Sequence, residues 1–250
     1  LERNNRLGGR IHTYNKKPLT YEIGGARFHK GHKNLFELIK MFNLEDKIFP
    51  ISNEKTFIPI KNKFTKKYDI SKLIKKILDK SDSFKKEQLL KMNMVDLCNK
   101  ILTKEECLYF QNGFEYVCEL EDLNAYEAID TFRNDLNNDF QFYLFQNGFG
   151  ELLENMEQFL KDNRCNIKLQ HTLRDFKLKD GTYHLDVLSG TKKLSYKTEN
   201  LILALDKTPL LSLPYLKSLK PEFNSVEKIP LVRIYAVYPK DPKTKKVWFH

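Results

Sequence analysis

The chain has 250 residues, of which 41% are hydrophobic and 30% charged, and its formal net charge is +10 at pH 7. This length allows one large domain or two modest ones, each with its own core. No stretch approaches the roughly 18–20 apolar residues of a membrane-spanning helix, so we predict no membrane span. The four cysteines form no Cys-x-x-Cys pair, which favours reduced thiols and a cytoplasmic protein over a disulfide framework.

Residues 1–30 contain two Gly-Gly pairs and predict loops and turns. Apolar side chains at helical spacing from Leu35 to Phe42 predict a helix there. Pro50 and Pro59 break the following stretch, in which short strands are plausible.

From Asp69 to about Phe132 the spacing of apolar residues predicts helices over 69–79, 83–101, 103–117 and 124–132. Ser83 and Thr103 are candidate N-caps, and Glu106 completes a capping-box pattern with Thr103. The first helix shows a clear apolar stripe, formed by Ile70, Leu73, Ile74, Ile77 and Leu78.

The segment from Lys55 to Lys91 has twelve lysines against four acidic residues. Such a surplus can bind nucleic acid or an anionic surface. The apolar stripe instead predicts that Lys72, Lys75 and Lys76 lie on the solvated face of a helix, and the segment lacks closely spaced aromatic residues for stacking bases. Nucleic-acid binding is therefore the disfavoured alternative.

Residues 139–146 are rich in aromatic side chains and predict a strand, and the Asn147–Gly150 turn leads into a helix that extends to Leu160. The period then changes, and strands are predicted over 166–176, 182–188 and 193–204 with turns at Asp180-Gly181 and Ser189-Gly190. Asn200–Leu205 is a continuous apolar run, as expected of a strand buried on both faces. A last strand is predicted over 230–238.

A helical block between two regions of mixed structure suits a two-domain enzyme with its site at the domain interface. Near the start, Glu2 follows a residue that could end a strand, where an acidic side chain in a dinucleotide fold accepts hydrogen bonds from ribose hydroxyls. In the turn Gly8-Gly9-Arg10, glycine allows backbone to approach a pyrophosphate, and arginine offers a planar donor fork to phosphate oxygens.

The combined pattern of Glu2, Gly8-Gly9-Arg10, Thr13 and Glu22-x-Gly24-Gly25-x-Arg27 resembles the flavin-containing amine oxidases, and the Gly24–Arg27 step is most similar to the amino-acid oxidase branch. This resemblance implies an α/β fold: an FAD-binding Rossmann-like domain of the glutathione-reductase type, interrupted by a largely helical substrate domain. The expected parts are FAD-binding segments over 1–50 and 147–212, a helical substrate domain over 51–146, and the start of the substrate-domain sheet over 213–250.

The resemblance also implies roles for single residues. Those expected to bind FAD are Glu2, Gly8, Gly9, Arg10, Gly24, Gly25, Ala26, Arg27 and Leu173, the last through its backbone beside the adenine. Arg27 is further expected to meet a substrate carboxylate. Asn4 departs from the basic residue that the family commonly has there. Arg233 matches a family lysine that holds a water near flavin N5, and arginine stays charged and cannot act as a base at neutral pH.

The activity implied is oxidation of an amine or amino acid by hydride transfer to flavin N5, with O2 as electron acceptor. Because the chain opens on Leu1 inside the motif, we expect the preceding Gly-rich phosphate loop and the C-terminal flavin-covering segment to be missing from it. Two alternatives remain open: an FAD-dependent desaturase or porphyrinogen-type oxidase, and a flavin fold kept as a binding module. His29-x-x-His32 has no third ligand at a suitable spacing, so we predict no metal site. The sequence does not specify the oligomeric state.

Overall fold

The computed structural model describes residues 1–16, 19–51, 58–60, 63–65, 67–114, 116–134 and 141–226, together with Val232 and Tyr235. They fall into two compact units. Unit 1 contains the described residues of 1–26 and 145–233, and unit 2 contains those of 27–144 and 234–250. The predicted domain boundaries concern functional parts and stay predictions. The strand predicted over 230–238, including Arg233, lies outside the described residues apart from Val232 and Tyr235.

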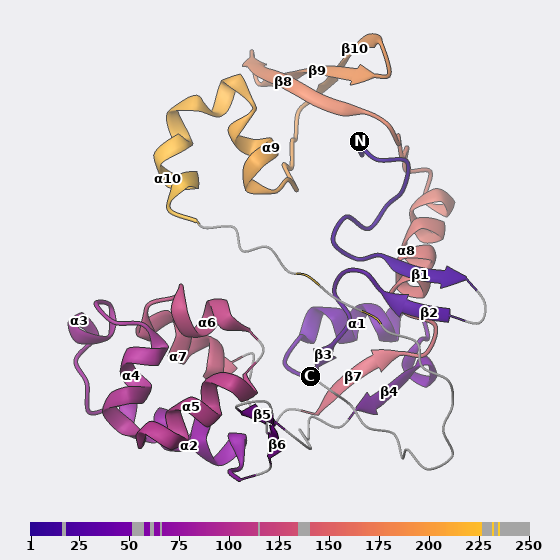
Figure 1. Ribbon diagram of the computed structural model, residues 1–250. Helices are drawn as coiled ribbons and strands as arrows, with labels where there is room; N and C mark the ends of the chain where they lie inside the picture. The colour runs from indigo at the N-terminus through magenta and orange to yellow at the C-terminus, as the bar shows by residue number, and fades with distance from the viewer. Residues whose placement is uncertain are drawn as a thin grey trace. The chain divides into compact units, whose positions relative to one another are not determined.

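Unit 1 begins with an irregular segment that leads into a hairpin of β1 (Thr13–Lys16) and β2 (Leu19–Glu22) (Figure 1). The strands are antiparallel, with Thr13 opposite Glu22 and Lys16 opposite Leu19. Helix α8 (Gly150–Asp162) follows the predicted Asn147–Gly150 turn, and this confirms the helix expected there.

The rest of unit 1 is an antiparallel meander of β8 (Thr172–Lys179), β9 (Thr182–Ser189) and β10 (Lys192–Thr198). Both predicted turns are present, and Asp180 and Gly181 adopt φ values of 48° and 76°. The inner face packs Phe176, Leu185 and Val187 against Leu213. Short helical segments complete the unit: α9 (Lys207–Leu211), a 3₁₀ turn (Pro214–Leu219) and α10 (Lys220–Asn224).

Two strand predictions in this region are corrected. The strand predicted from residue 166 begins at Thr172, because residues 168–171 bond instead to the start of the chain. The buried strand predicted over Asn200–Leu205 is wrong, since β10 ends at Thr198 and Ile202 is 91% exposed. A local turn stops the ladder: the Thr198 hydroxyl donates to the Asn200 carbonyl and accepts from its N–H.

Unit 2 opens with a small sheet in the order β3 (Phe28–His29), β7 (Phe142–Phe145) and β4 (Ile48–Ile51). Helix α1 (Lys33–Met41) lies between β3 and β4 in the sequence (Figure 1). Phe28 pairs with Tyr143 and His29 with Phe142. A 3₁₀ turn (Glu45–Lys47) precedes β4, and β5 (Ile58–Ile60) pairs with β6 (Lys63–Thr65).

The helical bundle of unit 2 consists of α2 (Ile70–Ser81), α3 (Lys86–Leu89), α4 (Met94–Ile101), α5 (Lys104–Gly113), α6 (Val117–Glu121) and α7 (Ala125–Asn134). The predicted stripe on α2 is confirmed, because Leu73, Ile74 and Ile77 lie in the core. The capping box of Thr103 and Glu106 is also confirmed.

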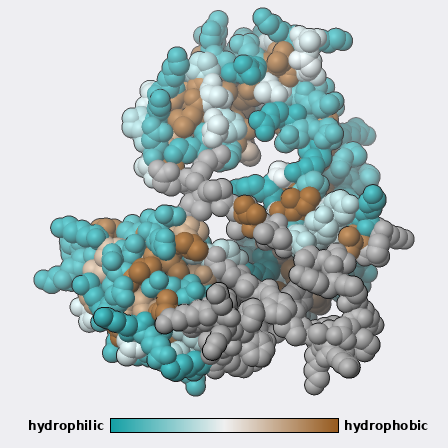
Figure 2. Space-filling view, viewed as in Figure 1, coloured by the Kyte–Doolittle hydropathy of each residue, from teal (hydrophilic) through white to brown (hydrophobic). Residues whose placement is uncertain are grey.

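The predicted helix over 83–101 is split into α3 and α4, and Ser83 caps neither. Its hydroxyl donates to the Lys80 carbonyl, which ends α2, and Lys85 and Asn93 are the N-caps. The surface of the bundle seen in Figure 2 is mainly hydrophilic with small apolar patches. Lys72 and Lys75 are exposed as predicted, whereas Lys76 is half-buried against Glu106.

The fold is therefore a mixture of helices and small sheets. The strand pairs β1–β2, β3–β7, β5–β6, β8–β9 and β9–β10 are all antiparallel. The Rossmann-like arrangement of the predicted FAD domain stays a prediction. Within the described ranges, no helix is long and apolar enough to cross a membrane.

Candidate functional site

The hairpin of unit 1 brings the two glycine motifs together. Beyond its strands, the ladder continues as the Ile23 N–H donates to the His12 carbonyl at 2.8 Å and the Gly25 N–H to the Arg10 carbonyl at 3.0 Å. Gly8 and Gly9, with φ values of 100° and 53°, form the turn just before this ladder. Residues 8–10 and 24–25, separate in the sequence, are therefore adjacent in the structure.

Gly24 lies against the backbone of the first motif. A Cβ at this position would meet the Arg10 carbonyl oxygen at 1.8 Å and its carbon at 2.7 Å, so no larger residue fits without moving the chain. The second Gly pair is thus explained in part by close packing between the two motifs. Arg10 and Gly25 themselves are exposed, and Gly24 and Ala26 are half-buried.

Arg6 holds the first turn in shape, a role that the sequence analysis missed. Its guanidinium donates to the carbonyls of Leu7 at 3.0 Å, Gly9 at 2.8 Å and Ile11 at 3.2 Å. These carbonyls flank the Gly8-Gly9-Arg10 turn on both sides. The signal in the sequence was an arginine two positions before the glycines, whose planar donor fork suits several acceptors at once.

Glu2 lies beside the segment that precedes β8. Its backbone N–H donates to the Lys168 carbonyl at 2.9 Å, and its carbonyl accepts from His171 at 2.8 Å. The Glu2 carboxylate accepts the Asn4 N–H at 2.7 Å. These bonds place Glu2 beside the start of β8. Leu173, which is predicted to lie beside the adenine, is in this strand and pairs with Val187 of β9.

The hairpin is fastened to the start of α8 by Thr13 and Glu22. The buried Glu22 carboxylate accepts the Phe149 N–H at 2.6 Å and the Thr13 hydroxyl at 2.7 Å, and Thr13 Oγ1 accepts the Gly150 N–H at 2.8 Å. Phe149 is the N-cap residue of α8 and makes no side-chain cap of its own. A carboxylate at a helix N-terminus satisfies its first N–H groups and favours its dipole.

Arg27 belongs to unit 2, whereas the residues that the hairpin joins belong to unit 1. It is exposed, and its Nη2 donates to the Tyr116 hydroxyl at 2.5 Å. Its guanidinium carbon is 5.9 Å from the centre of the Phe142 ring, within the range of a cation–π contact. The structure therefore assigns Arg27 partners that the sequence did not indicate.

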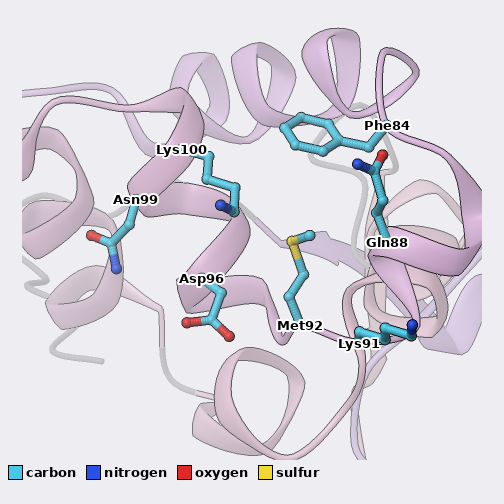
Figure 3. A pocket seen from close by; sticks show the side chains of 7 residues that line it. All are labelled: Phe84, Gln88, Lys91, Met92, Asp96, Asn99 and Lys100. Atoms are coloured by element: carbon cyan, nitrogen blue, oxygen red, sulfur yellow. The ribbon is translucent and has the colours of Figure 1, made fainter.

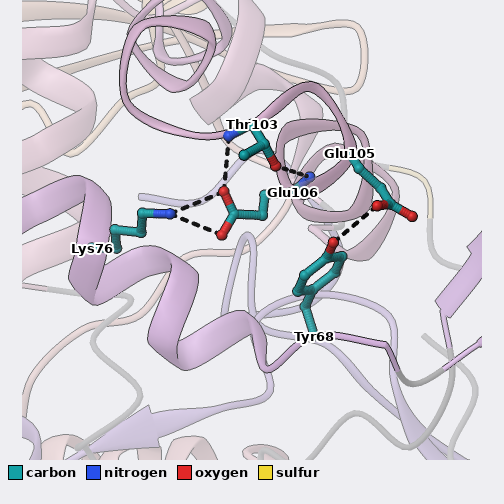
Figure 4. Close-up of polar contacts among 5 residues, drawn as sticks. All are labelled: Tyr68, Lys76, Thr103, Glu105 and Glu106. Carbon is teal, nitrogen blue, oxygen red and sulfur yellow. Dashed lines mark hydrogen bonds and ion pairs between the residues drawn. The ribbon is translucent and has the colours of Figure 1, made fainter.

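Two glutamates at the start of α5 accept hydrogen bonds from side chains in and just before α2 (Figure 4). Lys76 donates to both Glu106 oxygens at 2.8 and 2.9 Å, and the Thr103 N–H donates to the same carboxylate at 2.8 Å. The hydrogen bond from Lys76 lowers the pKa of Glu106 below its usual value. Glu105 accepts from Lys67 and Tyr68, and the Lys67 bond lowers its pKa too. The Lys76 contacts join α2 to α5, and those of Lys67 and Tyr68 join the segment before α2 to the same helix.

An open hollow of about 670 Å³ lies along α3 and α4, and Phe84, Met92, Lys91, Asp96 and Lys100 line part of it (Figure 3). It contains none of the predicted site residues. His29 and His32 have ring centres 4.1 Å apart, but the described part of the chain contains no cluster of three or more metal-ligating side chains. The four cysteines are free.

The family model described as flavin containing amine oxidoreductase matches residues 1–240. No curated protein matches the chain. Among solved structures, three of putrescine oxidase match: a triple and a double mutant from a redesign of cofactor binding, and the wild type bound to putrescine. Their TM-scores are 0.65, 0.63 and 0.64, and each is 16% identical.

Each of these alignments covers 85% of this chain and 53% of the putrescine oxidase chain. The chain therefore spans about half the length of the structures it matches. At this identity the likeness concerns the fold. The family model covers nearly the whole chain, and on that basis the chain belongs to the flavin containing amine oxidoreductase family.

Proposed function

We propose that this chain forms part of an FAD-dependent oxidoreductase that oxidises an amine or an amino acid. The observation that carries the proposal is the junction of the two glycine motifs by the β1–β2 hairpin, with Gly25 bonded to Arg10. Family membership supports a flavin cofactor, and putrescine oxidase, a protein of similar fold, is an oxidase of an amine.

The chemistry of the side chains in unit 1 fits the adenosine and diphosphate parts of FAD. Glu2 offers carboxylate oxygens for ribose hydroxyls, and the Gly8-Gly9 turn presents backbone without side chains where a pyrophosphate would approach. Arg10 offers an exposed guanidinium for phosphate oxygens. We propose that these residues hold FAD together with Gly24, Gly25 and Ala26, and that the backbone of Leu173 lies beside the adenine.

A bound FAD would supply a hydride acceptor for the substrate, and we propose O2 as the final electron acceptor. The protein's own part is to hold the substrate in a fixed direction and to exclude water. We propose that Arg27 orients an anionic group of the substrate, since its guanidinium is exposed and offers a planar fork of hydrogen-bond donors. Arg233 remains our candidate for the residue at the edge of the flavin.

A visible absorption spectrum of the complete gene product, before and after anaerobic addition of amines and amino acids, tests this function. We expect the absorption of oxidised flavin, bleached by one of these substrates, with release of ammonia or a smaller amine. Bleaching without such a product would indicate oxidation of a carbon–carbon bond instead. A flavin that no substrate bleaches would indicate a binding module, and absence of flavin would contradict the proposal.

Matched arginine variants connect the spectrum to the site. Arg10→Gln removes the proposed phosphate contact, whereas Arg174→Gln removes an exposed arginine from β8 in the same unit. We expect the dissociation constant of FAD to rise about tenfold for Arg10→Gln, as loss of a charge-assisted hydrogen bond would cause. An equal effect of the two variants would show that Arg10 has no specific role in binding.

A further inference from the structure

A hydrogen bond connects Arg27 to Tyr116, and both residues belong to unit 2. The Arg27 Nη2 to Tyr116 Oη distance is 2.5 Å, and the residues are 89 positions apart. Arg27 comes two residues after Gly25, and Tyr116 immediately precedes α6. No family motif in the sequence includes Tyr116, so its contact with a predicted site residue is information that the structure adds.

Tyr116 is held in place by the core of the bundle. Its ring lies edge-to-face against Phe114, with ring centres 6.0 Å apart. Phe114 is buried and in turn packs against Phe110 and Phe132, at 5.7 and 4.8 Å between ring centres. The half-buried Tyr116 ring is therefore packed against a close-packed core, which restricts the positions that its hydroxyl can take.

A second aromatic side chain restricts the Arg27 guanidinium. Phe142 lies 5.9 Å from its carbon, and Phe142 is itself fixed by pairing with His29 in the β3–β7 ladder. Of the five guanidinium N–H groups, one donates to Tyr116, which leaves others for a ligand. Over the part of the chain that the structure describes, no Asp or Glu forms an ion pair with Arg27.

We propose that Tyr116 is a positioning residue, which fixes the direction in which Arg27 presents its charge to a carboxylate on the substrate. This inference rests on the proposed function of Arg27. An arginine binds a carboxylate through two parallel N–H···O hydrogen bonds in one plane. Its affinity for the carboxylate therefore depends on how the guanidinium plane is oriented. The Tyr116 hydroxyl supplies that orientation, and the Phe142 ring limits rotation about the long side chain. The substrate class that this arrangement favours is an amino acid over a diamine.

The first experiment tests the contact itself and requires no activity. The complete protein is treated with phenylglyoxal, which modifies accessible arginines, and the rate at Arg27 is followed by peptide mass spectrometry. Tyr116→Phe keeps the ring and removes the acceptor, so we expect Arg27 to react about threefold or more faster, as released side chains gain rotamer freedom. Arg133 and Arg174 serve as internal references.

The matched control is Tyr126→Phe. Tyr126 is an exposed tyrosine of α7 in the same unit, and its ring, which Lys86 contacts at 4.5 Å, is kept in the variant. This variant should leave the Arg27 rate unchanged. If Tyr116→Phe also leaves it unchanged, Tyr116 does not hold Arg27 and the inference is wrong.

The second experiment tests the function of the contact, with benzoate as the carboxylate probe and calorimetry as the readout. We expect Tyr116→Phe to weaken benzoate binding about tenfold, the effect of a charge-assisted hydrogen bond. In an Arg27→Lys background the same change should alter binding less than twofold, because the ammonium group has no fork to orient. A purely structural role would weaken binding equally in both backgrounds and would overturn the proposal, as would failure of the wild-type protein to bind benzoate.

These outcomes are separate from those that test the proposed function. Loss of the oxidase function would appear as a missing or unbleached flavin spectrum, with the Arg27 modification rates still responding to Tyr116→Phe. Loss of the positioning role would appear as unchanged modification rates in a protein whose flavin bleaches normally. When a substrate is known, the variant should raise KM for amino acids more than for amines that lack the carboxylate.

Discussion

The Glu22 carboxylate accepts the backbone N–H of Phe149 at 2.6 Å, across 127 positions of the sequence. Glu22 lies in the hairpin that joins the two glycine motifs, and Phe149 begins α8. The first turn of this helix is therefore capped by a distant strand and not by its own N-cap residue. As a result, the proposed cofactor-binding loops are attached to a three-turn helix at a fixed point.

Replacement of Gly148 by alanine should disrupt this junction. The new Cβ would lie 2.4 Å from Thr13 Cγ2 and 2.5 Å from Glu22 Oε1, at a residue with φ of +86°. Gly181→Ala is the matched control, since Gly181 has φ of +76° and nothing within 4 Å of the added atom. We expect Gly181→Ala to lower the free energy of unfolding by about 1 kcal/mol and Gly148→Ala by about 2–4 kcal/mol. Urea unfolding of both variants gives the comparison, and equal losses would contradict a tightly packed junction.

Arg6→Met should weaken flavin binding although we propose no contact of Arg6 with the cofactor. The variant keeps the length of the side chain and removes the hydrogen bonds to the carbonyls of Leu7, Gly9 and Ile11. The Gly8-Gly9-Arg10 turn should then lose its fixed shape, and the dissociation constant of FAD should rise about tenfold or more. Fluorescence titration measures the effect, with Arg174→Met as control. An unchanged affinity would show that the turn keeps its shape without Arg6.

Acid should weaken the ion pair between Lys76 of α2 and Glu106 of α5. Its pKa is lowered in the folded protein, chiefly by the hydrogen bond from Lys76, from a usual value of 4.5. The folded state therefore binds this proton less readily than the unfolded state, so the stabilisation is present above pH 4.5 and disappears as the pH falls through the lowered pKa. Glu106→Gln should destabilise the protein at neutral pH and progressively less below pH 4.5.

Glu105→Gln is the companion variant in the same helix. Both side chains of the Lys67–Glu105 ion pair are exposed, so added salt should screen its contribution to the free energy of unfolding. The Glu106 side chain is only 15% exposed, so salt should screen the Lys76–Glu106 pair less. Urea unfolding at low and high salt separates the two. If salt removes both effects equally, the Lys76–Glu106 pair is no better shielded than a surface pair.

The cysteines should differ in their reactivity toward iodoacetamide. Cys165 is exposed and should be labelled first. Burial and the neighbouring Glu119 raise the pKa of Cys118 to about 11, and burial raises the pKa of Cys98 still further, so both thiolates are scarce at neutral pH. Peptide mass spectrometry over time should show slow labelling of Cys118, and of Cys98 only in denaturant. Early labelling of Cys98 in buffer would show that α4 opens readily.

Local patterns predicted the helical bundle well. The apolar spacing on α2 and the Thr103–Glu106 capping box depend on neighbours three or four positions apart, which the sequence shows directly. The turns of the β8–β10 meander were likewise predicted from Asp180-Gly181 and Ser189-Gly190. The predicted helix over 83–101 does not start at Ser83, because the Ser83 hydroxyl bonds to the Lys80 carbonyl, and it is split because Asn93 caps a new helix, α4.

Tertiary contacts decided what the sequence could not show. The apolar run of Asn200–Leu205 has the composition of a buried strand, yet burial depends on a neighbouring strand and not on composition. The glycine motifs identified the candidate cofactor site, but the hydrogen bonds of Arg6 and Glu22, and that of Tyr116 with Arg27, have partners that no local spacing predicts.

The connection from Glu22 to Phe149 also sets an order for folding. The hairpin is synthesised before residues 27–144, and α8 only after them, so the cap cannot form until more than a hundred intervening residues have been made. A loop of that length is entropically costly to close. Pairing of Phe28 with Tyr143 brings the two ends of the 28–143 segment together and shortens the effective loop to about ten residues. This segment should therefore fold first on the ribosome, and completion of the proposed cofactor-binding unit should wait for it.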